Sequence, residues 1–248
     1  MKITPHGKTR RNRTRLEKYN LLIGDYQDLA YKLSELYNIK ICPYCNENYT
    51  YTLIVKNEQG LPKNICRPDF DHFYCKSSDM HKALNLYNLV PSCQLCNSRI
   101  KGEKTNDRNL HYHPFFDNLF EDFTFHIDPK GPNIWENFDI KTIVNPQIKN
   151  RISFKEYSKN DDFTRADNTI KFFYLKERAN FHKTEIVHIL KTAEYNSLNR
   201  IKNIQNIIGA RNLISLIFPY YKCDIRSMSL GKLKSDVTTY VMRKIGLI

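Results

Sequence analysis

The sequence contains no apolar run near the 18–20 residues of a membrane-spanning helix, and its polar N-terminus has no apolar segment typical of a signal peptide. It also contains no internal repeat and no low-complexity tract. These absences argue against a membrane, an exported or a repeat protein. Seven cysteines in a chain without an export signal favour a reducing compartment, where thiols bind metal or stay free. We therefore expect a cytoplasmic protein with no membrane partner.

Acidic residues are few relative to basic ones: 26 Asp and Glu stand against 39 Lys and Arg in 248 residues, a net charge of +13. The net charge is +5 in residues 1–40, −3 in 41–140 and +11 in 141–248. Nucleic acid is the commonest polyanionic partner of such a protein. A slightly acidic middle segment between basic flanks suits a carboxylate site held between phosphate-binding segments. The alternative is a basic protein without such a partner.

Residue patterns predict an α+β protein, in which a basic arm at 8–20 precedes a first helix. The predicted elements are a helix at 21–37, strands at 49–56 and 65–74 joined by a long turn, a short helix at 80–86, a strand at 89–93, a helix at 96–101, a strand toward the end of 111–129, a long helix capped at 167–169, and a helix at about 200–217. The chain then divides into an arm and helix (1–40), a small α+β core (41–130) and a mainly helical, basic region (131–248).

Two CxxC pairs, Cys42 with Cys45 and Cys93 with Cys96, are separated by 47 residues. A CxxC turn presents two sulfurs to one ion, and two such turns complete the tetrahedral S4 shell of a structural zinc site. A single pair would also fit a redox motif, but that reading leaves the second pair unexplained. Zinc would close the loop between the pairs and fix its geometry. The other three cysteines are expected to be ordinary buried thiols: Cys66, Cys75 and Cys223.

The segment CRPDFDHFYCK, residues 66–76, lies inside this loop and carries Asp69, Asp71 and His72. Such charges are costly to bury unless they are paired or bind metal, so the segment is either a solvated turn or a metal site. A neutral histidine can accept a proton from water, and carboxylate and amide oxygens are hard ligands for Mg²⁺ or Mn²⁺. Neighbouring side chains on a regular strand point to opposite faces, so the strand must end, twist or bulge at Asp71 and His72 if both act on one phosphate.

The motifs DFDHFY, YNLVPSCQLCN and RIKG, together with the two CxxC pairs, resemble the HNH (ββα-metal) endonucleases over residues 42–104. The resemblance implies a zinc-stapled ββα-metal core that hydrolyses phosphodiester bonds, with DNA the favoured substrate. It implies that His72 is the general base, that Asp71 and Asn97 bind the catalytic Mg²⁺ or Mn²⁺, and that Asn88 braces the loop after the first strand. Two further candidates are Asp69 and His113. Asp69 is expected to be solvated or to lie beside the ligands, with a substitute ligand as the alternative. His113 can form a metal-binding element with His111, but as a histidine beside aromatics it is expected to pack. Phosphate contacts are expected from Lys76, Arg99, Lys101 and Lys104.

A longer pattern adds HPFFDN and NTIKFFYLKERANFHK, and is similar to the HNH component of Septu-type anti-phage systems, some of which accompany retrons. That similarity implies an ABC-type ATPase partner. The chain departs from the pattern at Cys75, where proline is expected, and at Ala179-Asn180, where an aromatic residue is expected. His182 belongs to the later element and is expected to pack.

Two other functions fit the same sequence. One is an HNH nuclease that cuts RNA such as tRNA. The other is a zinc-bound nucleic-acid-binding module without catalysis, which the joint presence of Asp71, His72 and Asn97 disfavours. The basic C-terminal helices can bind nucleic acid, dock a partner subunit or simply be solvated.

Overall fold

The computed structural model describes residues 27–76, 80–83, 85–131, 137–145, 161–196, 200–201, 203 and 213–248. The predicted basic arm at 8–20, the first six residues of the helix predicted at 21–37 and much of the helix predicted at 200–217 lie outside the described residues.

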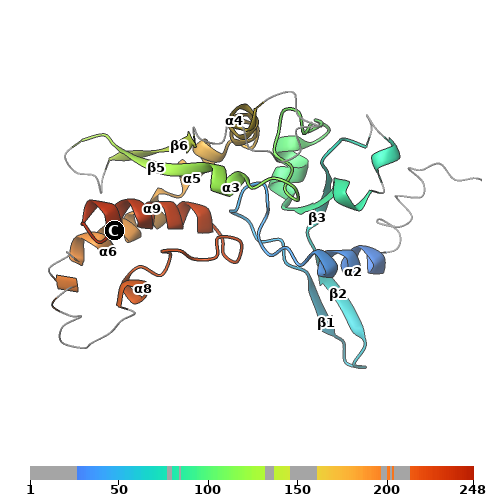
Figure 1. The fold of residues 1–248 in the computed structure, drawn as a ribbon. Coiled ribbons are helices and arrows are strands. Elements are labelled where there is room, and N and C mark those ends of the chain that lie inside the picture. Colours follow the sequence, from blue (N-terminus) through green and yellow to red (C-terminus); the bar gives the residue numbers. More distant parts are fainter. Residues whose placement is uncertain are drawn as a thin grey trace, which may run out of the picture.

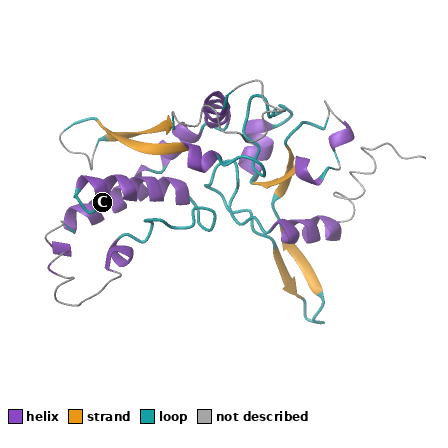
Figure 2. Ribbon diagram, viewed as in Figure 1, coloured by secondary structure: helices purple, strands orange, loops and turns teal. Residues whose placement is uncertain are grey.

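The elements combine short helices with short strands (Figures 1 and 2). In chain order they are α2 (Gln27–Tyr37), β1 (Leu53–Lys56), β2 (Pro62–Cys66), β3 (Asp69–His72), η2 (Met80–Lys82), η3 (Leu86–Asn88), β4 (Leu89–Ser92), η4 (Leu95–Lys101), α3 (Leu119–Asp122), β5 (Phe123–Pro129), β6 (Phe138–Val144), α4 (Asp162–Phe172), α5 (Leu175–Phe181), α6 (Lys183–Tyr195), α8 (Leu213–Ile217) and α9 (Gly231–Lys244). The described strands form three two-stranded antiparallel sheets. The predicted α+β class is confirmed.

A strand–strand–helix unit lies between the two CxxC pairs and just beyond the second. β3 pairs with β4 so that Asp71 lies opposite Val90 and His72 opposite Leu89. η4 follows, with its hydrogen bonding widened to a π-helical turn: the Gly102 amide donates to the Asn97 carbonyl at 2.8 Å. Gly102 ends η4 at φ +54°, a conformation that costs glycine least. This order of elements places the predicted site residues on β3, η3 and η4.

The strand predicted at 65–74 is two strands with different partners. β2 pairs with β1 in a hairpin that projects away from the rest of the molecule (Figure 1), and β3 pairs with β4. Pro68 lies between them and has no amide hydrogen to continue a ladder. Cys66, at the end of β2, is exposed, so the prediction of a buried thiol is wrong there. Cys75 is buried as predicted, and Cys223 is partly exposed.

The C-terminal region combines a β-ribbon with helices. Along β5 the side chains alternate between buried and exposed, and its buried residues Phe123, Phe125 and Ile127 belong to the same core as α9. The long helix predicted from residue 167 is instead three helices. The first of them, α4, begins earlier, because the Asp161 carboxylate accepts the Thr164 amide at 2.7 Å and caps it. Tyr174, at φ +54°, then separates α4 from α5.

One apolar cluster extends from the four CxxC cysteines through β5 and β6 to α4, α5, α6 and α9. A second, smaller cluster joins α2 to Phe70 of β3 and Leu89 of β4. The β3–β4 pair is therefore held from two sides. None of the helices in the described part of the chain has the length and apolarity that a transmembrane span requires.

Candidate metal centre and nuclease site

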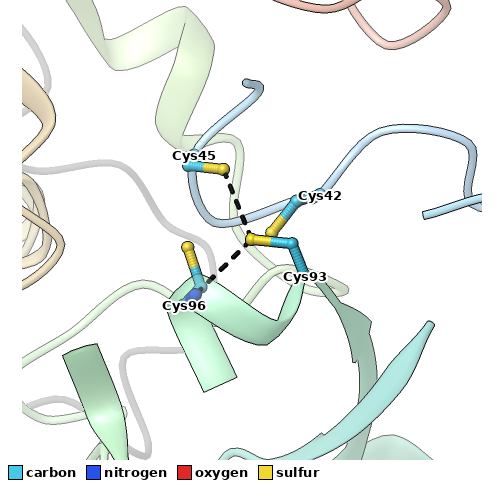
Figure 3. A group of neighbouring side chains, drawn as sticks. All are labelled: Cys42, Cys45, Cys93 and Cys96. Carbon is cyan, nitrogen blue, oxygen red and sulfur yellow. Dashed lines mark hydrogen bonds between the residues drawn. The ribbon is translucent and has the colours of Figure 1, made fainter. Parts of the chain in front are cut away.

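The sulfurs of Cys42, Cys45, Cys93 and Cys96 all lie within 4.8 Å of one another and turn toward a common centre (Figure 3). Two come from the loop after residue 41, and two flank the start of η4. The Cys45 and Cys93 sulfurs are 4.0 Å apart, close to the about 3.8 Å that tetrahedral geometry with bonds of about 2.3 Å requires. The four thiols can therefore bind a metal ion such as zinc.

Hydrogen bonding within the cluster favours ionised sulfur at two positions. Contact with Cys42 lowers the pKa of Cys45 to about 7 and holds the pKa of Cys93 well below its usual range. Burial holds the pKa of Cys42 well above the usual value. The Cys93 sulfur also accepts the Cys96 amide at 3.4 Å and the Asn48 side-chain amide at 3.6 Å. Such N–H donors stabilise thiolate charge, which is the form that binds metal.

The first CxxC turn is joined directly to β3. The Tyr44 hydroxyl, inside the turn, donates to Asp71 Oδ2 at 2.6 Å, and the Lys101 ammonium donates to Asp71 Oδ1 at 2.8 Å. Lys101 also donates to the His72 carbonyl at 2.5 Å. Asp71 is 1% exposed and Lys101 is 2% exposed. Burial raises the pKa of Asp71, and Lys101 and Tyr44 oppose that rise.

This pairing changes the expected role of Lys101. The sequence predicts a side chain that reaches phosphate, but the structure buries the ammonium group against a carboxylate. The reason is periodicity: Asp69 and Asp71 lie two apart on one face of β3, and Asn97 and Lys101 lie one turn apart on the facing side of η4. Each carboxylate therefore meets one η4 side chain.

The other pair consists of Asp69 and Asn97. The Asn97 side-chain amide donates to Asp69 Oδ2 at 3.2 Å, and both residues are partly exposed. The structure thus places the side chains of Asp69 and Asn97 side by side through the Asn97 amide nitrogen, whereas both Asp71 oxygens accept hydrogen bonds from Tyr44 and Lys101. Carboxylate and amide oxygens fit Mg²⁺ or Mn²⁺ chemically.

His72 is the last residue of β3, where the sequence predicts that the strand ends. Its Nε2 is 3.1 Å from the Ala83 carbonyl, which can only accept. The hydrogen bond therefore assigns the proton to Nε2 and the lone pair to Nδ1. Burial lowers the pKa of His72 to about 4, so the imidazole is neutral at pH 7. A neutral ring with a fixed tautomer has the chemistry of a general base.

Asn88 makes the backbone hydrogen bonds that the sequence predicts. Its Oδ1 accepts the Tyr74 amide at 2.7 Å, and its Nδ2 donates to the carbonyls of Tyr74 and Lys82, each at 3.1 Å. Asn88 is 3% exposed. It therefore joins the segment after His72 to the segment that carries Ala83, the hydrogen-bond partner of His72.

The remaining candidates fall into two groups. His113 is 2% exposed and packs against Phe73, with ring centroids 4.3 Å apart, which matches its expected packing role. Arg99 and Lys104 are exposed near the end of η4, and Lys76 is partly exposed, so these three can meet a solvent-borne phosphate.

The sequence analysis misses three residues that contact the candidate site or the cysteine cluster: Tyr44, Glu47 and Arg178. Tyr44 gives a signal only as the middle of a CxxC turn. Glu47 and Arg178 are 131 residues apart and form an ion pair: Arg178 Nε donates to Glu47 Oε2 at 2.7 Å. Arg178 lies in the element KERANFHK, whose only sequence signal is the longer similarity. His182, from the same element, contacts Glu47 Oε1 at 3.1 Å rather than only packing.

The chain matches no family model, no curated protein and no solved structure. The function is therefore inferred from the chemistry of the site and from the sequence motifs.

Proposed function

We propose that this protein is a metal-dependent HNH endonuclease that hydrolyses phosphodiester bonds of nucleic acid, with DNA the favoured substrate. The observation that carries the proposal is the surroundings of His72. This residue, the last of β3, has a neutral imidazole of fixed tautomer. β3 pairs with β4, which leads into η4, and Asn97 of η4 contacts Asp69 of β3. A non-catalytic binding module does not require a buried, neutral histidine of fixed tautomer beside a pair of candidate metal ligands.

In this proposal His72 Nδ1 takes a proton from the attacking water. Asn97 and a β3 aspartate, Asp69 or Asp71, hold Mg²⁺ or Mn²⁺, which when bound neutralises charge on the phosphate and stabilises the leaving oxygen. Asp71 can serve through the lone pairs that its hydrogen bonds from Tyr44 and Lys101 leave over. Asn88 positions His72 through the backbone. The four cysteines hold a structural zinc ion that fixes the start of η4.

The test is cleavage of plasmid DNA and of total tRNA by the purified protein with Mg²⁺ or Mn²⁺. His72→Ala is expected to lower the rate about 10²–10⁴-fold, the usual contribution of a general base. The matched control is His81→Ala, because His81 is an exposed histidine nine residues further on. Equal cleavage by wild type and His72→Ala would remove His72 as the base. Cleavage of tRNA alone would replace DNA by RNA as the substrate.

Asp69→Asn and Asp71→Asn separate the two possible carboxylate ligands. The variant that loses the ligand should need a higher Mn²⁺ concentration for half-maximal cleavage, and the other should not. If neither variant changes the Mn²⁺ requirement, the divalent ion is not held on β3.

The similarity to Septu-type systems leads us to propose a cytoplasmic role in anti-phage defence beside an ABC-type ATPase. Co-purification with the product of a neighbouring ATPase gene, followed by the cleavage assay on the complex, tests this role. Absence of a complex and of any effect of the ATPase on cleavage would refute it.

A further inference from the structure

A cation from the C-terminal region lies against the cysteine cluster. Arg178, on α5, donates from Nη1 to the Cys96 sulfur at 3.3 Å. The two residues are 82 positions apart, and Arg178 is 9% exposed. A buried guanidinium is costly unless anionic partners surround it, and here the partners are a cysteine sulfur and a carboxylate.

Glu47 fixes the position of this guanidinium. Its Oε2 accepts Arg178 Nε at 2.7 Å, and its Oε1 contacts His182 Nε2 at 3.1 Å. Ser229 donates its hydroxyl to the Glu47 carbonyl. The carboxylate follows the first CxxC turn by two residues, so the turn itself holds the arginine in place. Arginine suits this position because its planar fork can serve a carboxylate and a sulfur at once.

The contact between Arg178 and the Cys96 sulfur can balance negative charge at the metal centre. Four thiolates around a divalent ion carry a net charge of −2, and the cluster is largely buried. Cys93 receives its hydrogen bonds from neutral amides, those of Cys96 and Asn48. Among the contacts of the described residues, Arg178 is the cation that reaches a cluster sulfur.

We propose that Arg178 is an outer-sphere partner of the metal centre: it stabilises the Cys96 thiolate of the bound ion and slows loss of that ion. This inference rests on the proposed zinc binding by the four cysteines. It makes α5, outside the strand–strand–helix unit, a determinant of how firmly that unit keeps its metal.

The experiment measures zinc transfer from the full-length, zinc-loaded protein to a chromogenic chelator under native conditions. Arg178→Gln keeps a donor and loses the charge, and it is expected to release zinc about 10–100-fold faster, the usual effect of losing an outer-shell partner. Arg178→Lys keeps the charge and loses the fork, so its rate of zinc release should lie between those of wild type and Arg178→Gln. Glu47→Gln, which loosens the guanidinium, should also accelerate release. The control Lys176→Gln removes an exposed cation from the same helix and should change nothing.

Cobalt substitution gives a readout that general destabilisation would not move. Removing a donor from a thiolate raises the energy of its lone pairs, so the sulfur-to-cobalt charge-transfer band should shift to longer wavelength in Arg178→Gln and stay unchanged in Lys176→Gln. If Arg178→Gln does not fold, Arg178→Lys and Glu47→Gln carry the same comparison.

The possible failures are distinguishable. One outcome is that wild type binds zinc and the Arg178 and Glu47 variants release it at the wild-type rate, with unshifted cobalt bands. This outcome would overturn the role of Arg178 and leave zinc binding intact. Wild-type protein that binds no zinc would overturn the zinc proposal, and the inference with it.

Discussion

Polar side chains in the β3–η4 region are buried in pairs whose members come from distant parts of the chain. Asp71 meets Lys101 and Tyr44, and Asn88 meets the backbone on both sides of the loop after His72. The family resemblance predicts the bracing role of Asn88, whose partners Tyr74 and Lys82 lie 14 and 6 residues before it. Local sequence cannot identify the Asp71–Lys101 pair, because that pair depends on which face of η4 turns toward β3. The sequence therefore predicts which residues gather here better than it predicts their partners.

Asn88→Ala should destabilise the protein by about 3 kcal/mol, because it leaves a partly buried amide and two partly buried carbonyls without their hydrogen bonds. Asn88→Asp should be no better, since a carboxylate cannot donate to carbonyls. Urea unfolding of the zinc-loaded protein measures the loss. The control is Asn85→Ala, whose exposed side chain accepts one amide and should cost about 1 kcal/mol. Equal losses for the two alanine variants would show that Asn88 is not a brace.

His113 should make the protein less stable in mild acid. Burial, with help from Arg108 and Arg165, lowers its pKa to about 3, while the unfolded chain keeps a histidine pKa near 6.5. The unfolded state therefore binds the proton first, and stability falls as the pH falls through 6.5 toward 3. The expected loss from this group is about 2 kcal/mol between pH 7 and pH 5.

The measurement is the free energy of unfolding at pH 7 and pH 5 for wild type and His113→Phe, which keeps an aromatic ring without a titrating group. The loss of unfolding free energy from pH 7 to pH 5 should be about 2 kcal/mol smaller in the variant than in wild type. Acid-driven metal loss affects both proteins and cancels in this comparison. Identical pH dependence in the two proteins would contradict the assignment.

At the scale of elements, short local signals predict β4 and η4 of the candidate site, whereas they miss the division of the strand predicted at 65–74 into β2 and β3. β4 and η4 appear close to their predicted bounds because Pro91 and the CxxC spacing confine them. The break at Tyr174 leaves no local signal: its backbone is left-handed, and Phe173 and Leu175 on either side of it are buried in the core. Likewise α4 begins where Asp161 caps it, six residues before the predicted cap.

Arg165 joins α4 to the loop before α3, so Arg165→Met should destabilise the protein by about 3–5 kcal/mol. Its guanidinium contacts Asp162 Oδ1 at 2.7 Å and Asp117 Oδ2 at 2.8 Å, and Nε donates to the Arg108 carbonyl at 2.7 Å. Removing it leaves two carboxylates without their cation. Chemical denaturation gives the size of the loss. Lys171→Met breaks an exposed ion pair on the same helix and should cost less than about 0.5 kcal/mol; a similar cost for both would refute a buried network.

At the scale of the whole molecule, the first CxxC turn is a hub between regions far apart in sequence. Tyr44 hydrogen-bonds to β3, Glu47 pairs with α5, and Asn46 hydrogen-bonds to the chain at the start of α9. Asn46 Oδ1 accepts the Lys232 amide at 2.7 Å, and the Asn46 carbonyl accepts the Leu230 amide at 2.7 Å. Gly231 lies between them because a β-carbon there would stand 2.6 Å from the Ile225 carbonyl oxygen. The conformation of the metal centre and that of the chain around the start of α9 are therefore coupled through Asn46.

Removal of the metal should accordingly speed hydrogen exchange at the Leu230 and Lys232 amides by about tenfold or more, a change of at least about 1.4 kcal/mol in local opening. The reason is that without an ion nothing joins the four cysteine sulfurs, so the turn that carries Asn46 loses its fixed geometry. The ladder between β5 and β6 is the internal reference, since its buried face lies in the core beside α9. Mass-resolved exchange before and after chelation makes the comparison. Unchanged exchange at both amides would show that Asn46 holds this segment without help from the metal, and equal acceleration in the β5–β6 ladder would show global unfolding in place of a local link.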